Sequence, residues 1–253
     1  MASRSVSRPA LAGPHFLGIG AQKAGTTWLH ANLAHHPRLF LTAEKELHFW
    51  DQRRHQGLRW YRAQFAVAPP ATLAGEITPA YAILPRRTVR EIRARFADLR
   101  FFYLIRNPVD RAWSAALRAL ERAGMTPEQT PDAWFLEHFS SPGSRQRGDY
   151  AACLQRWMAV FPPERFLVQR FETLVQEPRT VLSRCALHLG LDPEPFRHVP
   201  ESVLTLRRNP GPGLPLRPGL RRFLERLYHP RIRHLADVLG WNLDDWLEPS
   251  GPV

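Results

Sequence analysis

Cysteine and lysine are scarce in this sequence of 253 residues, which has only two of each. Cys153 and Cys185 fall in segments with the apolar pattern of helices, so a disulfide scaffold is excluded and a reducing compartment, the cytoplasm, is expected. No apolar run reaches the roughly 20 residues that a membrane-spanning helix needs. The first 14 residues lack the apolar stretch of a signal peptide and predict a disordered basic tail, which leaves 15–253 as a single domain.

The charge of the chain is unbalanced, with 35 basic against 23 acidic residues and a formal net charge of +12. Such an excess indicates a polyanionic partner, an anionic cofactor or simply a solvated surface. The arginines are spread along the chain rather than gathered in one arm, so a nucleic-acid partner is not expected. The two lysines, Lys23 and Lys45, both fall in segments with the character of active-site loops.

Short apolar strands alternate with helical segments along the whole chain, without repeats or a linker. We expect strands at 15–20, 39–41, 73–78, 100–105 and 165–169, and helices at 26–35, 57–65, 84–96, 108–123, 150–160 and 178–189. The stretch 124–147 predicts a loop with one short helix, and two helical segments follow the Pro/Gly-rich loop 205–218. The pattern predicts an α/β fold, a three-layer sandwich around a central parallel sheet, whose ligands bind beyond the carboxyl ends of the strands.

The end of the first strand has the pattern of a phosphate-binding loop. Residues 20–27, GAQKAGTT, place two glycines five positions apart before a pair of hydroxyl residues and a helix. Glycines allow backbone N–H groups to turn towards an anion, and the N-terminus of the following helix adds positive potential. A loop for nucleoside triphosphates has lysine directly after the second glycine, where this chain has Thr26. Because the strand at 100–105 ends in Arg106 and Asn107 and offers no carboxylate for magnesium, ordinary ATP or GTP chemistry is disfavoured.

This loop resembles the 5'-phosphosulfate loop of the sulfotransferases that use 3'-phosphoadenosine 5'-phosphosulfate (PAPS). The run QKAGTTWL (22–29) carries the likeness, which implies that Lys23 contacts the bridge between phosphate and sulfate. The resemblance also implies that the amides and hydroxyls of Gly25, Thr26 and Thr27 hold the 5'-phosphate. A purely structural glycine turn is the alternative for this motif taken alone.

A second motif, LIRNPVDRAWS (104–114), resembles the 3'-phosphate site of the same family. The family has an arginine at a strand end and a serine eight residues later, and Arg106 and Ser114 match these positions. A guanidinium at the strand end and a hydroxyl two turns into the helix can reach one phosphate. Asn107 departs from the family, which more often has aspartate there. The order and spacing of the two motifs together predict a P-loop-like nucleotide site for PAPS.

A third segment, KELHFWD (45–51), has the residues of an acid–base site. In an extended chain Glu46 and His48 point to one face, where a carboxylate and an imidazole can deprotonate an acceptor. The run is similar to the acid-x-His-Phe-aromatic-Asp motif of heparan sulfate-type sulfotransferases, which implies that Glu46 is the base, with His48 assisting and Asp51 in support. In cytosolic small-molecule sulfotransferases a histidine is the base, so His48 stays a rival. No third ligand is spaced for a metal, and none is expected.

Weaker matches complete the resemblance. Ile77 stands where heparan sulfate enzymes have a lysine that helps to bind substrate and cofactor, which weakens the case for a sulfated-glycan acceptor. Tyr150 matches a family helix near the cofactor, with an ordinary core tyrosine as the alternative. Arg207 and Arg208 match a basic C-terminal loop over the nucleotide.

The resemblance implies a metal-independent enzyme that moves a sulfuryl group from PAPS to a hydroxyl or amine of an unidentified small-molecule or glycan acceptor. Two alternatives stay open on the residues alone. A nucleotide kinase-like P-loop enzyme would turn over ATP with magnesium instead of PAPS. A non-catalytic basic module would bind a polyanion or nucleic acid with steep salt dependence and transfer no sulfate. The oligomeric state is not readable from one sequence.

Overall fold

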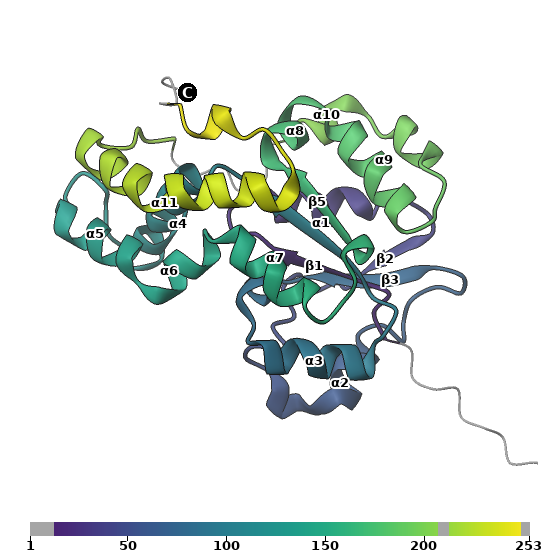
Figure 1. The fold of residues 1–253 in the computed structure, drawn as a ribbon. Coiled ribbons are helices and arrows are strands. Elements are labelled where there is room, and N and C mark those ends of the chain that lie inside the picture. Colours follow the sequence, from purple (N-terminus) through teal and green to yellow (C-terminus); the bar gives the residue numbers. More distant parts are fainter. Residues whose placement is uncertain (1–12, 207–212, 249–253) are drawn as a thin grey trace, which may run out of the picture.

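The most apolar runs of the chain form the centre of a parallel sheet. The computed structural model describes residues 13–206 and 213–248, and its sheet has five strands in the order β2-β3-β1-β4-β5 (Figure 1). Every neighbouring pair is parallel. The strands are β1 (Phe16–Gly20), β2 (Leu39–Leu41), β3 (Leu73–Ile77), β4 (Arg100–Ile105) and β5 (Phe166–Arg170). The prediction of the strands and of a parallel sheet is confirmed.

The two halves of the sheet meet at β1 and β4. The chain first builds β2 and β3 on one side of β1 and then crosses over to add β4 and β5 on the other side. Every residue of β1 is buried, and in β4 only Arg100 is partly exposed, as expected for strands covered on both faces. The carboxyl ends of strands at such a crossing leave a crevice in which ligands of α/β proteins bind.

Helices cover both faces of the sheet and give the three layers that the sequence predicted. On one face α1 (Thr26–Leu33) packs with α9 (Pro178–His188), and on the other α3 (Arg86–Arg95) packs with α7 (Tyr150–Met158) (Figure 1). The long α11 (Pro218–Leu239) contacts α7 and α4 (Pro108–Arg122). The shorter helices are α2 (Gly57–Ala63), α8 (Phe171–Gln176) and α10 (Glu201–Leu204), and 3-10 turns span Arg54–Gln56, Pro79–Ile83, Pro163–Arg165, Glu194–His198 and Asp244–Trp246.

Two helices occupy the stretch 124–147, for which the sequence predicted a loop with one short helix. They are α5 (Asp132–Ser140) and α6 (Pro142–Arg147). In α5 the side chains of Phe135 and Phe139, four positions apart, are buried and fix one face of the helix. In α6 the side chain of Ser141 accepts a hydrogen bond from the N–H of Ser144, and Pro142 takes the first helical position. The residues that indicated a turn therefore begin a helix.

The remaining expectations concern the C-terminal helical segments, the two cysteines, membrane-spanning helices, and the predicted tail and loop. The two helical segments predicted after 218 are α11 and the turn Asp244–Trp246. Both cysteines are buried and free, and the cytoplasmic location stays a prediction. Among the described residues, no helix combines the length and hydropathy that crossing a bilayer requires. Residues 1–12 of the predicted tail and 207–212 of the predicted loop lie outside the described residues.

Candidate active site

The turn after β1 presents backbone N–H groups at the crossing of the sheet. Gly25 has a φ of 86°, in the left-handed region, and begins α1 without a side-chain cap. A Cβ at this position would lie 3.1 Å from Leu174 and 3.2 Å from the ring of Phe171, so glycine suits both the conformation and the space. Thr26 and Thr27 follow as the first helical residues. Because no side chain caps α1, its first amides stay available to an anion.

Lys23 lies on this turn in a cationic environment. Its φ is 67° and its side chain is partly buried. Burial lowers the pKa of Lys23 from its ordinary value, and the charges of Arg118 and Arg106 lower it further. When the surroundings of a lysine disfavour its positive charge, contact with an anion strongly stabilises its protonated form. The turn around Lys23 is therefore suited to phosphate or sulfate.

Arg106 follows the end of β4, the strand beside β1. Its guanidinium carbon lies 4.7 Å from the ring centroid of Phe171, and its Nη2 lies 4.0 Å from Oδ2 of Asp110, one turn into α4. The same ring bounds Gly25 on the phosphate-binding turn. The two motifs predicted to hold the two ends of one nucleotide therefore lie at one edge of the sheet and share a wall.

The other cofactor candidates have different surroundings. Ser114 is partly buried two turns into α4, on the same helix as Arg118. Tyr150 is buried, and its hydroxyl donates a hydrogen bond of 2.8 Å to the main-chain oxygen of Arg106. We therefore expect Tyr150 to hold Arg106 rather than to touch a nucleotide. Arg207 and Arg208 lie outside the described residues, and their role stays a prediction.

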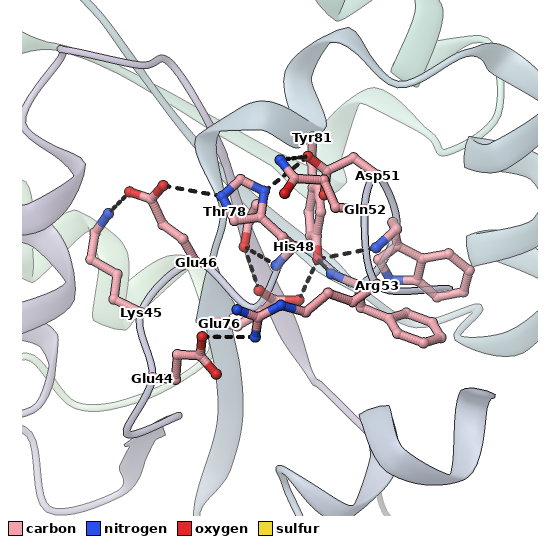
Figure 2. Close-up of polar contacts among 12 residues, drawn as sticks. Glu44, Lys45, Glu46, His48, Asp51, Gln52, Arg53, Glu76, Thr78 and Tyr81 are labelled. Carbon is pink, nitrogen blue, oxygen red and sulfur yellow. Dashed lines mark hydrogen bonds and ion pairs between the residues drawn. The ribbon is translucent and has the colours of Figure 1, made fainter. Parts of the chain in front are cut away.

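The structure brings together the three residues of the predicted acid–base segment (Figure 2). Nε2 of His48 lies 3.5 Å from Oε2 of Glu46, and Nδ1 of His48 lies 2.9 Å from Oδ2 of Asp51. Lys45 pairs with the other carboxylate oxygen of Glu46. An imidazole between two carboxylates is held in one orientation, and the contact at Nδ1 selects its tautomer.

The backbone that brings these side chains together is not the extended one that we expected. Glu46 has a φ of 65° and His48 a φ of 51°, both in the left-handed region. That region is unfavourable for residues with a Cβ, so other contacts must stabilise it. The prediction that the two side chains point to one face of an extended segment was therefore wrong in its geometry, although the side chains do meet.

Glu46 is the more accessible of the two candidate bases. Its side chain is 39% exposed, whereas that of His48 is 22% exposed. Both ring nitrogens of His48 face carboxylate oxygens. An acceptor approaching from solvent therefore reaches the carboxylate of Glu46 more readily than the ring of His48.

The acid–base segment lies at the same edge of the sheet as the two anion sites. The N–H of Glu46 donates to the main-chain oxygen of Ile77 at 3.2 Å, and that of Thr78 donates to Gly18 of β1 at 2.9 Å. β3 thus places the segment on the side of β1 opposite β4. Ile77 is buried and covers Gly18, so the position at which a lysine was expected from the resemblance is apolar and closed here.

Comparison with known proteins shows the family to which this chain belongs. The family model described as a sulfotransferase domain matches residues 14–207. The chain belongs to the sulfotransferase family. Its similarity to heparan sulfate-type members, expected from the KELHFWD segment, is also confirmed: heparan sulfate glucosamine 3-O-sulfotransferase 6 of Homo sapiens is 32% identical over 210 residues. Heparan sulfate glucosamine 3-O-sulfotransferase 3B1 of Mus musculus is 32% identical over 188 residues.

This chain of the sulfotransferase family spans about half of the length of these relatives. The alignments cover 75% and 70% of this chain, but only 59% of the human protein and 46% of the mouse protein. Among solved structures, a sulfotransferase from Alicyclobacillus acidocaldarius has a TM-score of 0.75 and 24% identity, covering 94% of this chain and 100% of that one. Mouse sulfotransferase SULT7A1, complexed with PAP, has a TM-score of 0.59 and 18% identity, covering 90% of this chain and 86% of that one. Both confirm the sulfotransferase fold.

Some site residues of this sulfotransferase were not singled out from the sequence. Arg118 follows Ser114 by four positions, a spacing that has meaning only once α4 is known to be a helix. His30 of α1 has its Nε2 3.1 Å from the main-chain oxygen of Thr42, and burial lowers the pKa of His30. Glu76 was noted only as part of a motif, although a carboxylate inside an apolar strand is itself a signal of a buried polar network. Within 13–206 and 213–248, no three His, Cys, Asp or Glu side chains gather as a metal site requires.

Proposed function

We propose that this sulfotransferase moves a sulfuryl group from PAPS to a hydroxyl or amine of an acceptor and releases adenosine 3',5'-bisphosphate (PAP). One observation carries the proposal. Two cationic sites, at the turn around Lys23 and at Arg106, flank the crossing between β1 and β4 and share the wall of Phe171. A nucleotide with phosphates at its 5' and 3' ends matches two separate anion sites, whereas ATP has its phosphates in one chain.

The residues take roles in binding according to their position. The amides of the turn and the hydroxyls of Thr26 and Thr27, which begin α1, would hold the 5'-phosphate. Arg106 and Ser114 would bind the 3'-phosphate, with the guanidinium as a fork for two oxygens. Lys23 would contact the oxygen that bridges phosphate and sulfur.

The proposed reaction is an in-line displacement at sulfur. The acceptor oxygen or nitrogen forms a bond to sulfur while the bond from sulfur to the bridging oxygen breaks, and the acceptor proton passes to the carboxylate of Glu46. The negative charge that develops on the leaving phosphate oxygen is stabilised by Lys23 and the oriented amides, an effect of roughly 3–4 kcal/mol per essential donor. His48, held by Asp51, positions Glu46 and can share its proton.

The class of acceptor is part of the proposal. The relatives named above act on a glucosamine of heparan sulfate. In this chain Ile77 is apolar and buried where the resemblance expects a substrate-binding lysine. We therefore propose that the acceptor is either a small molecule or a glycan. We also propose that the enzyme works in the cytoplasm.

The test combines nucleotide binding with an acceptor screen. Calorimetry should detect binding of PAP, and isotope-labelled PAPS offered with alcohols, amines and glycans should give a sulfated product that is identified by its mass. Turnover of ATP with magnesium but not of PAPS would favour a kinase-like enzyme. Salt-sensitive binding to heparin or DNA without heat from PAP would favour a non-catalytic module.

A further inference from the structure

A carboxylate that the proposed reaction does not use lies directly beneath the acid–base segment (Figure 2). Glu76 of β3 is fully buried. Its Oε1 accepts hydrogen bonds from the hydroxyls of Tyr61, at 2.8 Å, and Tyr81, at 3.0 Å. Its Oε2 accepts from the hydroxyl of Thr78 at 2.6 Å.

Two of these hydroxyls also bind the backbone of the acid–base segment. The hydroxyl oxygen of Tyr81 accepts from the N–H of Phe49 at 2.9 Å and from that of Trp50 at 3.4 Å. The hydroxyl oxygen of Thr78 accepts from the N–H of His48 at 3.5 Å. Each of the three consecutive amides 48–50 is therefore tied to Glu76 through one hydroxyl.

The donor and acceptor roles in this network require that the carboxylate of Glu76 is ionised. Backbone N–H groups can only donate, so the hydroxyls of Thr78 and Tyr81 accept from the segment and must direct their own protons to Glu76. Burial raises the pKa of Glu76, while the hydroxyl and amide donors oppose that effect. A carboxylate accepts all of these donors at once, whereas a neutral carboxylic acid or amide would bring a donor of its own into a shell of donors.

The network acts where the segment has no regular secondary structure to support it. Residues 44–48 belong to neither helix nor strand, and Glu46 and His48 both have left-handed φ values. Such a backbone persists only when its surroundings fix it. The amides held by Glu76 through these hydroxyls belong to His48 itself and to the two residues that follow it.

We propose that Glu76 is a positioning residue: its ionised carboxylate, through Thr78 and Tyr81, holds the backbone that brings Glu46 and His48 together. The catalytic consequence rests on the proposed function, but the structural one does not. Because Glu76 is fully buried beneath the segment, its loss should lower kcat without changing nucleotide binding. This distinguishes it from Lys23 and Arg106.

The test compares Glu76→Gln with Glu76→Asp and Tyr81→Phe, with Tyr228→Phe as matched control. Tyr228 is another fully buried tyrosine, and its hydroxyl donates to the main-chain oxygen of Ser144, far along the chain from the acid–base segment. Two readouts are taken on the full chain: hydrogen exchange by mass spectrometry of peptides that cover 45–52 and 100–105, and turnover of PAPS together with calorimetry of PAP.

The expected pattern is local. In Glu76→Gln the amides of 48–50 should exchange at least about tenfold faster while 100–105 is unchanged, kcat should fall roughly 10- to 100-fold, and the Kd of PAP should stay within about twofold. Tyr81→Phe should change the same peptide less, and Tyr228→Phe should leave both readouts as in the wild type. Glu76→Asp keeps the charge and should lie nearer the wild type than Glu76→Gln.

Several outcomes would overturn the proposal. One is wild-type exchange and kcat in Glu76→Gln; another is faster exchange throughout the sheet, which would make Glu76 a general core residue. If Glu76→Gln does not fold, Tyr81→Phe decides, since wild-type exchange at 49 and 50 would contradict the network. If the wild type neither binds PAP nor turns over PAPS, the proposed function fails, and the exchange data still judge the role of Glu76.

Discussion

The two parts of the active site are held in place in different ways. The proposed nucleotide end, at residues 20–27 and Arg106, is fixed by the sheet: β1 and β4 are neighbours, and each ends at one of the two proposed anion sites. The acid–base segment has no such support. Its residues 44–48 are irregular, and it is held by one backbone bond to Ile77 of β3 and by hydrogen bonds to the side chains of Thr78, which follows β3, and Tyr81 of the 3-10 turn Pro79–Ile83.

Because of this difference, phosphate binding and proton transfer depend on different groups of the protein. A loop between a strand and a helix N-terminus binds phosphate through its backbone, so it tolerates changes in side chains elsewhere. An acid–base pair works only if two side chains keep a short, directed contact, so it depends on every group that fixes the backbone beneath it. Variants of the two regions should therefore give opposite patterns of kcat and nucleotide affinity.

The largest effect is expected for Glu46→Gln. Loss of the general base should reduce kcat roughly 100- to 10,000-fold, while calorimetry with PAP should give the wild-type Kd, because the amide keeps the shape of the side chain. Glu44→Gln is the matched control, since Glu44 is a nearby carboxylate that pairs with Arg53 instead of His48. Retained turnover in Glu46→Gln would transfer the role of base to His48.

Arg106→Ala should give the reverse pattern at the nucleotide end. Hydrogen bonds to a charged group contribute about 1.5–3 kcal/mol, so the Kd of PAP should rise roughly 10- to 100-fold. Binding of AMP, which has no 3'-phosphate, should change little. Arg170→Ala is the control, because Arg170 ends the neighbouring strand β5 but pairs with Glu172 and Asp245. An equal loss of affinity for PAP and AMP would contradict the assignment of the 3'-phosphate to Arg106.

The sequence predicted the strand, turn and helix at the proposed nucleotide end well because their determinants are local. The spacing of Gly20 and Gly25, followed by hydroxyl residues and a run of helical character, specifies a strand, a turn and a helix. Alternation of strands and helices also predicted the parallel sheet. The sequence could not show that the sheet places β4 next to β1, on which the joint use of Lys23 and Arg106 depends.

The acid–base segment was only half predictable for the opposite reason. The motif identified Glu46, His48 and Asp51, but the left-handed backbone at the first two comes from contacts with Thr78 and Tyr81, about thirty residues later. No pattern of period 2 or 3.6 encodes such a contact. Only one of the two helices in 124–147 was predicted, because Ser141 and Pro142 serve both turns and helix starts.

Asp51→Asn should have a smaller effect within the acid–base segment. Asp51 accepts from Nδ1 of His48 at 2.9 Å and so fixes the tautomer that faces Glu46. An amide at this position can turn its NH2 group towards the ring and reverse the tautomer, which should lower kcat about 5- to 10-fold. PAP binding should be unchanged. A loss of nucleotide affinity without a loss of kcat would place Asp51 outside the acid–base chemistry.

The smallest effect, the pH dependence of PAP affinity, concerns Lys23 at the nucleotide end. Burial and the charges of Arg118 and Arg106 lower the pKa of Lys23 in the free protein. A bound anion favours the protonated lysine, so the complex should hold more protons than the free protein. Affinity should therefore be complete below the pKa of free Lys23 and fall as pH rises from that value towards the higher pKa of the complex. Where half of the free lysine is deprotonated, the loss is only about twofold.

Calorimetry from pH 8 upwards, where the phosphates of PAP are fully ionised, checks this prediction. Binding at alkaline pH should take up protons, which appears as a dependence of the measured heat on the buffer. Burial raises the pKa values of Tyr61, Tyr81 and Tyr103, so these groups do not titrate in this range. In Lys23→Arg the side chain stays charged and the pH dependence should disappear. The same dependence in Lys23→Arg as in the wild type would mean that another group takes up the proton and that Lys23 does not face the bound phosphate.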